Sequence, residues 1–213
     1  MNLIKDLEIQ LEEKCRFCNP PERERILYET EHFYVMVSLG PIVEGYLLIV
    51  TKNHIGACLN IPITYLTEFL ELKEKVRSIL LQAYGCCLFY EHGKLGTSLK
   101  MTDGHKHCYH AHLHCIPTKI KLTNLIDKEF EGERFEDFRS FHDLLNGVQK
   151  YLYIEDDKLI IYQPKIKIRK QYLRYMLANS LGTTERWDWV NNQNWELINR
   201  TTEKLKKYFN ELS

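Results

Sequence analysis

The stretch His110-Ala111-His112-Leu113-His114 carries a histidine at every second position. The side chains of a β-strand repeat with a period of two, so a strand here would project all three imidazoles from one face. Ala111, Leu113 and Cys115 would then point to the other face and pack into a core. Pro117 closes the run, as expected at the end of a strand. We therefore predict a strand that presents three histidines side by side.

Two kinds of chemistry use such a row of imidazoles. The first is metal binding, for which neutral imidazole is a common ligand. The second is nucleophilic catalysis, because an imidazole with a pKa near neutrality can attack phosphorus without a neighbouring base. His105 and His107 lie just upstream and add to the cluster. A third interpretation is a histidine-rich strand that has only surface affinity for metals.

Near the N-terminus, Cys15 and Cys18 are separated by two residues. This spacing can place two thiolates on one zinc ion, which takes four ligands in a tetrahedron. No second pair of cysteines with this spacing follows, so the missing ligands would be histidines, and His54 and His110 are the candidates. The alternative is a turn that carries two thiols and no metal.

The composition of the 213 residues suits a globular protein without a charge-driven partner. Lys+Arg and Asp+Glu both number 29, so no global field draws the chain to nucleic acid or to a membrane. No stretch approaches transmembrane length, and the N-terminus lacks the apolar region of a signal peptide. Seven cysteines without secretory spacing indicate a reducing compartment. We expect a cytoplasmic protein.

The order of the expected elements indicates an antiparallel α+β fold, because no strand–helix unit of a parallel sheet repeats. Expected strands cover 26–37, 46–50, 86–90, the histidine run, 151–154 and 159–162. Expected helices cover 1–14, the stretch between Pro62 and Gly85, helical turns around 135–145, then 171–180 and 195–212. We expect residues 1–119 to form one domain that carries the histidine row, and residues 120–213 to form an extension packed on the same unit.

The run from His110 to Ile116 resembles the His-φ-His-φ-His-φ-φ signature of the histidine triad (HIT) superfamily of nucleotide hydrolases and transferases. Further segments resemble parts of the same superfamily, namely the zinc knuckle at 15–18, the strand segment 45–55, the Phe-Glu-His-Gly variant at 89–93, and the C-terminal extension of longer members at 169–174, 181–182 and 187–189. The likeness is therefore to a zinc-bearing branch with a long C-terminal extension.

This resemblance implies that residues 1–119 form a nucleotide-binding catalytic domain, with a mostly antiparallel five-stranded sheet and helices, commonly paired into a homodimer. It also implies a hydrolase that cleaves at the α-phosphate of a nucleoside phosphate conjugate: a dinucleoside polyphosphate, a phosphoramidate or an adenylylated adduct. One alternative is a nucleotidyltransferase of the same superfamily. Another is a nucleotide-binding or RNA-processing module without turnover.

The resemblance also implies roles for individual residues. His112 would attack the α-phosphate and hold it as a nucleotidyl-histidine, and His114 would stabilise the phosphoryl oxygens or the leaving group. His110 would serve either the active-site network or a zinc ion. In zinc-bearing members the ion would be structural, with all four coordination positions filled by protein side chains. Its ligands here would be Cys15, Cys18, His54 and His110.

Several positions depart from the usual pattern and concern the nucleotide. Lys106 and His107 stand where many members carry Gln-Ser or Gln-Thr to hold phosphate oxygens, and a cation there could still bind phosphate. Ser38 stands where members usually carry Asp or Asn for the ribose hydroxyls. Ser98, in the loop before the histidine run, could donate to phosphate.

Five further positions concern the strand segment and the extension. Tyr46 replaces a histidine that is common at that position. Arg169 and Arg174 could reach a terminal phosphate from the extension, but we expect a solvated basic face. Trp187 and Trp189 are expected to be packing anchors rather than a platform for a base.

Overall fold

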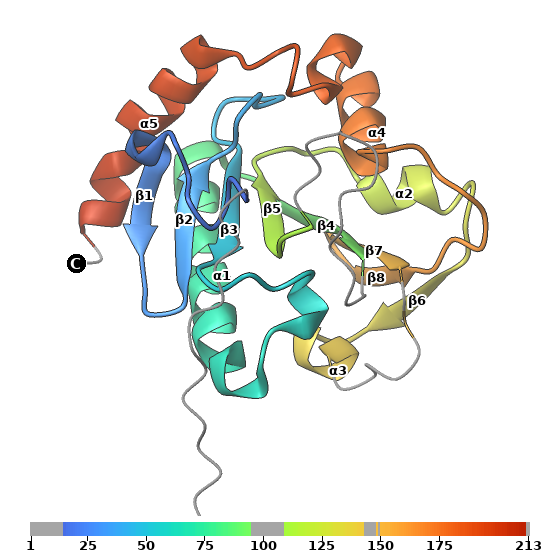
Figure 1. Cartoon of the computed structure of the whole chain (residues 1–213). Coiled ribbons are helices and arrows are strands. Elements are labelled where there is room, and N and C mark those ends of the chain that lie inside the picture. The colour runs from blue at the N-terminus through green and yellow to red at the C-terminus, as the bar shows by residue number, and fades with distance from the viewer. Residues whose placement is uncertain (1–14, 95–108, 143–147, 149, 212–213) are drawn as a thin grey trace, which may run out of the picture.

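The computed structural model describes residues 15–94, 109–142, 148 and 150–211, and it confirms the α+β class. The strands are β1 (Ile26–Glu29), β2 (Phe33–Val37), β3 (Leu47–Thr51), β4 (Leu88–Lys94), β5 (His112–Ile116), β6 (Gly132–Phe135), β7 (Lys150–Glu155) and β8 (Leu159–Tyr162). The α-helices are α1 (Ile63–Tyr84), α2 (Leu122–Ile126), α3 (Phe138–His142), α4 (Tyr172–Ser180) and α5 (Trp195–Asn210), shown in Figure 1. None of the described helices has the length and apolarity needed to span a bilayer.

All eight strands belong to one antiparallel sheet, in the order β1-β2-β3-β5-β4-β7-β8-β6. The first five strands lie together at one side, and the three strands that follow residue 119 continue the sheet beyond β4. The five expected strands are therefore present before residue 119, and the extension adds three strands to the same sheet in addition to packing on it. The division of the chain at residue 119 stays a prediction.

Some predicted element bounds need correction. The expected strand 26–37 is two strands, because the chain turns between them where the Thr30 N–H donates to the Phe33 carbonyl at 2.9 Å. Strand β4 continues to Lys94, past the expected turn at 91–93. Strand β6 was not predicted, since Gly132-Glu133-Arg134-Phe135 is exposed and shows no apolar alternation. The predicted helix 1–14 lies outside the described residues.

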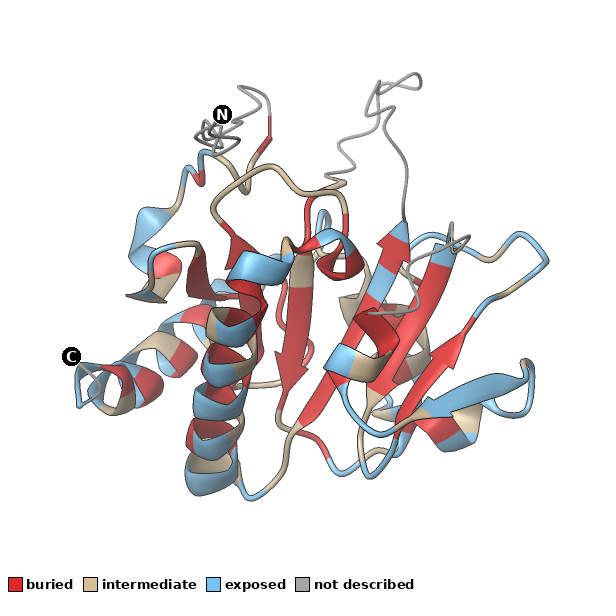
Figure 2. Cartoon of the chain, turned by 90° about the horizontal axis from the view of Figure 1, so that it is seen from below, coloured by how far each residue is buried: buried red, intermediate tan, exposed pale blue. Residues whose placement is uncertain are grey.

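Helix α1 and strand β5 define the main core. The apolar stripe of α1 is buried as its spacing predicts, and the helix ends at Gly85, whose φ is +76°. Ala111, Leu113 and Cys115 are at most 1% exposed and pack into the core that this helix shares with the sheet. In Figure 2 the central strands are mostly buried, whereas β6 and the outer side of α1 are exposed.

The opposite face of β5 carries the histidines. His112 and His114 are paired across the sheet with Val50 and Leu48, so these four side chains share a face. The extension covers part of this face through α2 and α4, whose buried residues join one core cluster with the sheet: Leu122, Ile126, Leu173 and Leu177 packed with Tyr90, Ile116 and Ile154. The extension therefore packs over part of the sheet face that carries the histidines.

The turn at Gly40 allows the extension to approach the loop before β3 closely. Gly40 has a φ of +64°, and a Cβ added there would lie 2.6 Å from the Trp189 Cα. Only glycine fits both the backbone angle and the contact. The loop before β3 and the extension therefore meet backbone to backbone.

Candidate active site

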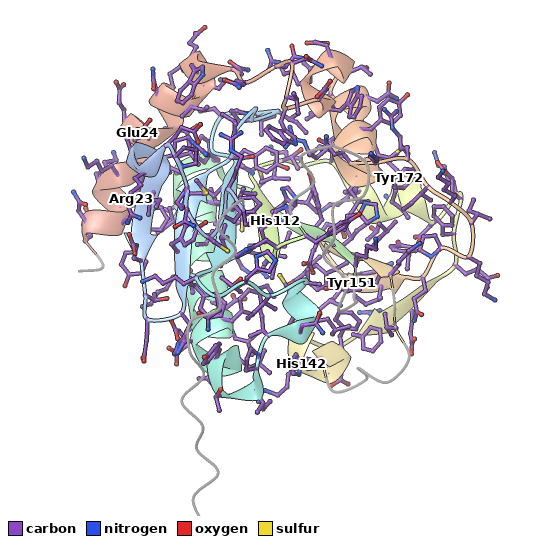
Figure 3. All side chains as sticks on the ribbon, in the orientation of Figure 1. Arg23, Glu24, His112, His142, Tyr151 and Tyr172 are labelled. Carbon is purple, nitrogen blue, oxygen red and sulfur yellow. The ribbon has the colours of Figure 1, made fainter. Side chains whose placement is uncertain are left out.

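A cavity of about 430 Å³ opens between the histidine face of the sheet and the extension. It is lined by His112 and His114 of β5, by Glu91 and Gly93 of β4, and by the segment 164–171 that leads into α4. Figure 3 shows His112 over the middle of the sheet, with Tyr151 on one side of it and Tyr172 of α4 on another. The cavity joins both halves of the chain in one candidate site.

His112 is held in one tautomer by the backbone. Its Nδ1 lies 2.7 Å from the carbonyl oxygen of His110. A carbonyl only accepts, so Nδ1 carries the proton and Nε2 keeps its lone pair. Burial lowers the pKa of His112 to about 4. The ring is therefore neutral near pH 7 and retains a nucleophilic nitrogen.

His114 is held by two buried tyrosines. The Tyr46 hydroxyl lies 2.7 Å from His114 Nδ1 and 2.6 Å from the Tyr90 hydroxyl. If Tyr90 donates to Tyr46, and Tyr46 donates to His114, the proton left without an acceptor is the Nε2–H of His114, a residue that lines the cavity. In the reverse direction the Tyr90 proton has no acceptor among the described residues. The first direction is favoured because buried hydroxyls satisfy their donors, and it leaves the proton of His114 on Nε2.

The two histidines thus carry opposite tautomers, one with a free lone pair and one with an N–H donor at Nε2. Burial is the main cause that lowers the pKa of His114, and the charges of His112 and Arg174 lower it further. Tyr46 therefore fixes the ring of His114. Apart from the replacement noted at this position in the sequence analysis, no pattern in the sequence pointed to this contact.

Tyr46→Phe is expected to lower kcat about tenfold and to leave KM within about twofold, because the hydroxyl that accepts from Tyr90 and fixes His114 is removed. Steady-state kinetics with a nucleoside phosphate conjugate, the substrate class that the resemblance implies, measures both constants. Tyr90→Phe is the matched variant, and its effect should be smaller, since Tyr46 can still donate to His114. An equal loss in both variants would indicate a general effect of packing instead.

Four side chains of types that commonly bind metals lie together at the edge of this site, and they are called the metal-type cluster below. The donor atoms of Cys15, Cys18, His54 and His110 all lie within 4.8 Å of one another. The sulfur–nitrogen distances are 3.2 Å from Cys18 to His54, 3.5 Å from Cys15 to His110 and 3.6 Å from Cys18 to His110; the two Nδ1 atoms are 3.3 Å apart. A zinc tetrahedron with ordinary bond lengths requires about 3.6 Å between sulfur and nitrogen and about 3.3 Å between nitrogens. The donor set and its spacing fit such an ion.

Thr51 fixes His110 for this arrangement. The Thr51 carbonyl lies 2.7 Å from His110 Nε2, and its hydroxyl lies 2.9 Å from the same atom. The carbonyl accepts the Nε2 proton, so Nδ1 presents its lone pair to the cluster. Both nitrogens of His110 are engaged in this way, and His110 acts on His112 through its carbonyl oxygen.

Of the predicted nucleotide-binding residues, only Ser38 lies in the described part of the chain. Ser38 lines the cavity, is 3% exposed, and donates to the Leu39 carbonyl at 3.3 Å. Ser98, Lys106 and His107 lie outside the described residues, so their roles stay predictions. Two residues that sequence analysis did not single out for chemistry, Glu91 and Tyr151, form part of the lining instead.

Glu91 is a buried carboxyl at the cavity wall, 3% exposed. It accepts hydrogen bonds from the Tyr151 hydroxyl and, at 2.9 Å, from the Cys58 N–H. Burial raises the pKa of Glu91 to about 7, against an ordinary value of 4.5. The folded protein therefore prefers the protonated carboxyl across the range between these values.

The stabilisation from protonated Glu91 is fully present below pH 4.5 and is lost as the pH rises through 7, because the folded pKa is the higher one. Glu91→Gln cannot titrate, so the variant should escape a loss of about 3 kcal/mol between pH 4.5 and pH 8. Urea unfolding of both proteins at the two pH values measures the difference. A wild type and variant that change in parallel would contradict the assignment.

Arg174 corrects the expected solvated basic face, because it is only 4% exposed. Its guanidinium lies over the Tyr46 ring, 5.3 Å from the centroid, and Arg174 lines the cavity. The signal was available in the sequence: Arg174, Leu177 and Ala178 follow at helical spacing and share the buried face of α4. Arg169, in contrast, is exposed.

The HIT domain family model matches residues 20–120 of the chain. The adenosine 5'-monophosphoramidase HNT1 of Candida albicans is 26% identical over 141 residues, which cover 62% of this chain and 86% of that protein. The protein of the same name from Saccharomyces cerevisiae is 27% identical over 120 residues, covering 54% and 70%. A hypothetical histidine triad nucleotide-binding protein from Sulfolobus tokodaii is 18% identical over 93% of both chains, with a TM-score of 0.46.

Proposed function

Since residues 20–120 place this chain in the HIT domain family, we propose that it is a hydrolase that cleaves nucleoside phosphate conjugates at the α-phosphate. The two relatives named adenosine 5'-monophosphoramidase support adenosine as the first nucleoside to test. The observation that carries the proposal is the pair of opposite tautomers on β5. A nucleophilic nitrogen and an N–H donor lie side by side, with ring centroids 4.7 Å apart, in a cavity large enough for a nucleotide.

The proposed reaction has two displacements. The Nε2 lone pair of His112 attacks the α-phosphorus, and the bond to the leaving group breaks with its electrons going to the leaving oxygen or nitrogen. His114 donates its Nε2–H to a phosphoryl oxygen or to the departing atom. Water then attacks the phosphorus of the nucleotidyl-histidine, and the bond to Nε2 breaks with its electrons returning to His112. The proton lost by the water replaces the one taken up by the leaving group, so the nucleoside monophosphate is released and both histidines are restored.

We also propose zinc as the ion for Cys15, Cys18, His54 and His110. The ion would supply a structural cross-link and no Lewis acid, because four protein ligands leave no position for water. Its ligands come from the N-terminal knuckle, the loop after β3 and the residue pair before β5. Binding would therefore hold the His110 carbonyl, and with it His112, in place.

The test of the proposed function is a single-turnover experiment with AMP conjugates. Purified protein is mixed with an AMP phosphoramidate or a diadenosine polyphosphate labelled at the α-phosphate and is quenched in milliseconds to seconds. A mass increase of one nucleotide on the protein, followed by release of AMP, is the expected result. Absence of both adduct and AMP across the panel would overturn the proposal.

A further inference from the structure

The charge lining the cavity is strongly one-sided, although the chain as a whole has equal numbers of acidic and basic residues. Among the lining residues that the structure describes, Glu91 is the single acid, and it is buried and hydrogen-bonded. Five lining cations come from the extension: Lys150, Lys167, Arg169, Lys170 and Arg174. A cavity wall of this sign favours a ligand with several negative charges.

Arg174 is a buried cation without a carboxylate partner in the described part of the chain. Its N–H groups donate to three backbone carbonyls, those of Gly40 at 2.6 Å and of Arg186 and Trp187 at 3.1 Å. Carbonyl dipoles orient the guanidinium and leave its full charge uncompensated. Burying such a charge is costly unless an anion completes the site. A phosphate group in the adjoining cavity would supply that anion.

Arg169 lies farther along the same cavity wall, and two aromatic rings orient its guanidinium. Its guanidinium lies between two aromatic rings, 3.6 Å from the Tyr175 centroid and 4.4 Å from the Trp187 centroid. Stacking occupies the faces of the guanidinium and leaves its N–H groups at the edge for an acceptor. No hydrogen bond or ion pair to any described residue uses these groups. Trp187 is thus more than a packing anchor, because it orients a cation.

A continuous series of contacts joins the histidines to this second cation. His114 contacts Tyr46, Arg174 lies over Tyr46, Arg174 Nε donates to the Trp187 carbonyl, and Arg169 stacks on the Trp187 ring. The positive groups therefore form a track that starts beside the triad and runs into the extension.

We propose that the extension builds a polyphosphate subsite along this track. Arg174 is its inner end, and Arg169 and Lys167 hold the phosphates of the leaving group while His112 attacks the α-phosphate. This inference rests on the proposed function and specifies its substrate class. It favours conjugates whose leaving group is a chain of phosphates over conjugates of an uncharged amine.

The test uses the double variant Lys167→Gln/Arg169→Gln in the full-length protein. Both residues are exposed, so the protein should fold normally. Lys128→Gln/Lys206→Gln is the matched control, since it removes two exposed cations that do not line the cavity. Binding of inorganic tripolyphosphate is measured by calorimetry, and kcat/KM is measured for diadenosine tetraphosphate and for an AMP phosphoramidate with a neutral amine.

Tripolyphosphate affinity and kcat/KM for diadenosine tetraphosphate should both fall about 30-fold in the cavity variant, whereas kcat/KM for the phosphoramidate should stay within about threefold. The control variant should change none of these values more than twofold. Equal tripolyphosphate affinity in the wild type and the cavity variant would overturn the subsite. If the wild type turns over neither substrate, the proposed hydrolase fails, and calorimetry alone still decides the subsite.

Discussion

His112→Ala is expected to lower kcat for cleavage of an AMP conjugate by about 10⁴-fold or more, because removal of a covalent nucleophile leaves only binding and charge stabilisation. The His110 carbonyl keeps the proton of His112 on Nδ1, which leaves a lone pair on Nε2. This nucleophilic nitrogen is lost when the ring is removed. Rapid quenching with intact-mass analysis should show the nucleotide adduct on the wild type and none on the variant. Nucleotide binding should persist within about tenfold.

The matched control is His32→Ala. His32 is half-buried, pairs with Glu68 and stacks on Tyr65, away from the cavity lining. Its replacement should leave kcat within about twofold. Residual turnover in His112→Ala at more than a hundredth of the wild-type rate would show that another group performs the attack.

Cys18→Ser is expected to reduce bound zinc from one equivalent to well below half. It should also lower the free energy of unfolding by about 3 kcal/mol or more, because a structural ion contributes its binding energy to folding. For a chain of this length, that loss corresponds to a fall in Tm of about 6–12 °C. Elemental analysis measures the metal, and thermal unfolding with and without a chelator measures the stability.

Cys86→Ser provides the comparison for this variant. Cys86 is half-buried and lies outside the metal-type cluster, so metal content and Tm should stay close to those of the wild type. The chelator should lower the Tm of the wild type and of Cys86→Ser, and it should have little further effect on Cys18→Ser. A wild type that holds no metal after expression with zinc would contradict the assignment.

Local periodicity was sufficient for the elements that build the triad face. The apolar spacing of α1 and its stop at Gly85 match the structure, and the alternation from Ala111 to Cys115 separates core side chains from histidines. The spacing of apolar residues depends only on residues that are close in the sequence. Each of these elements could therefore be predicted without knowledge of the tertiary fold.

The extension could not be predicted in the same way. The apolar runs of β7 and β8 indicated strands, but nothing in them specifies that β7 pairs with β4 in the same sheet. The role of Arg174 depends on that docking, since Arg174 reaches Gly40 from α4. The role of Tyr46 depends on hydrogen bonds to residues of two other strands, Tyr90 and His114. Long-range pairing therefore decided the parts of the site that the sequence did not reveal.

The position of β4 between β5 and β7 has a consequence for synthesis of the protein. Strand β5 ends at Ile116, and the partner of Phe89 in β7 is Glu155. About 40 residues separate these points, which a ribosome takes roughly 2–8 s to add. During that interval the outer edge of β4 has no partner strand, and an open edge invites pairing with other chains. The nascent chain is therefore expected to expose an open strand edge until β7 emerges, and pairing of β7 with β4 then removes that edge.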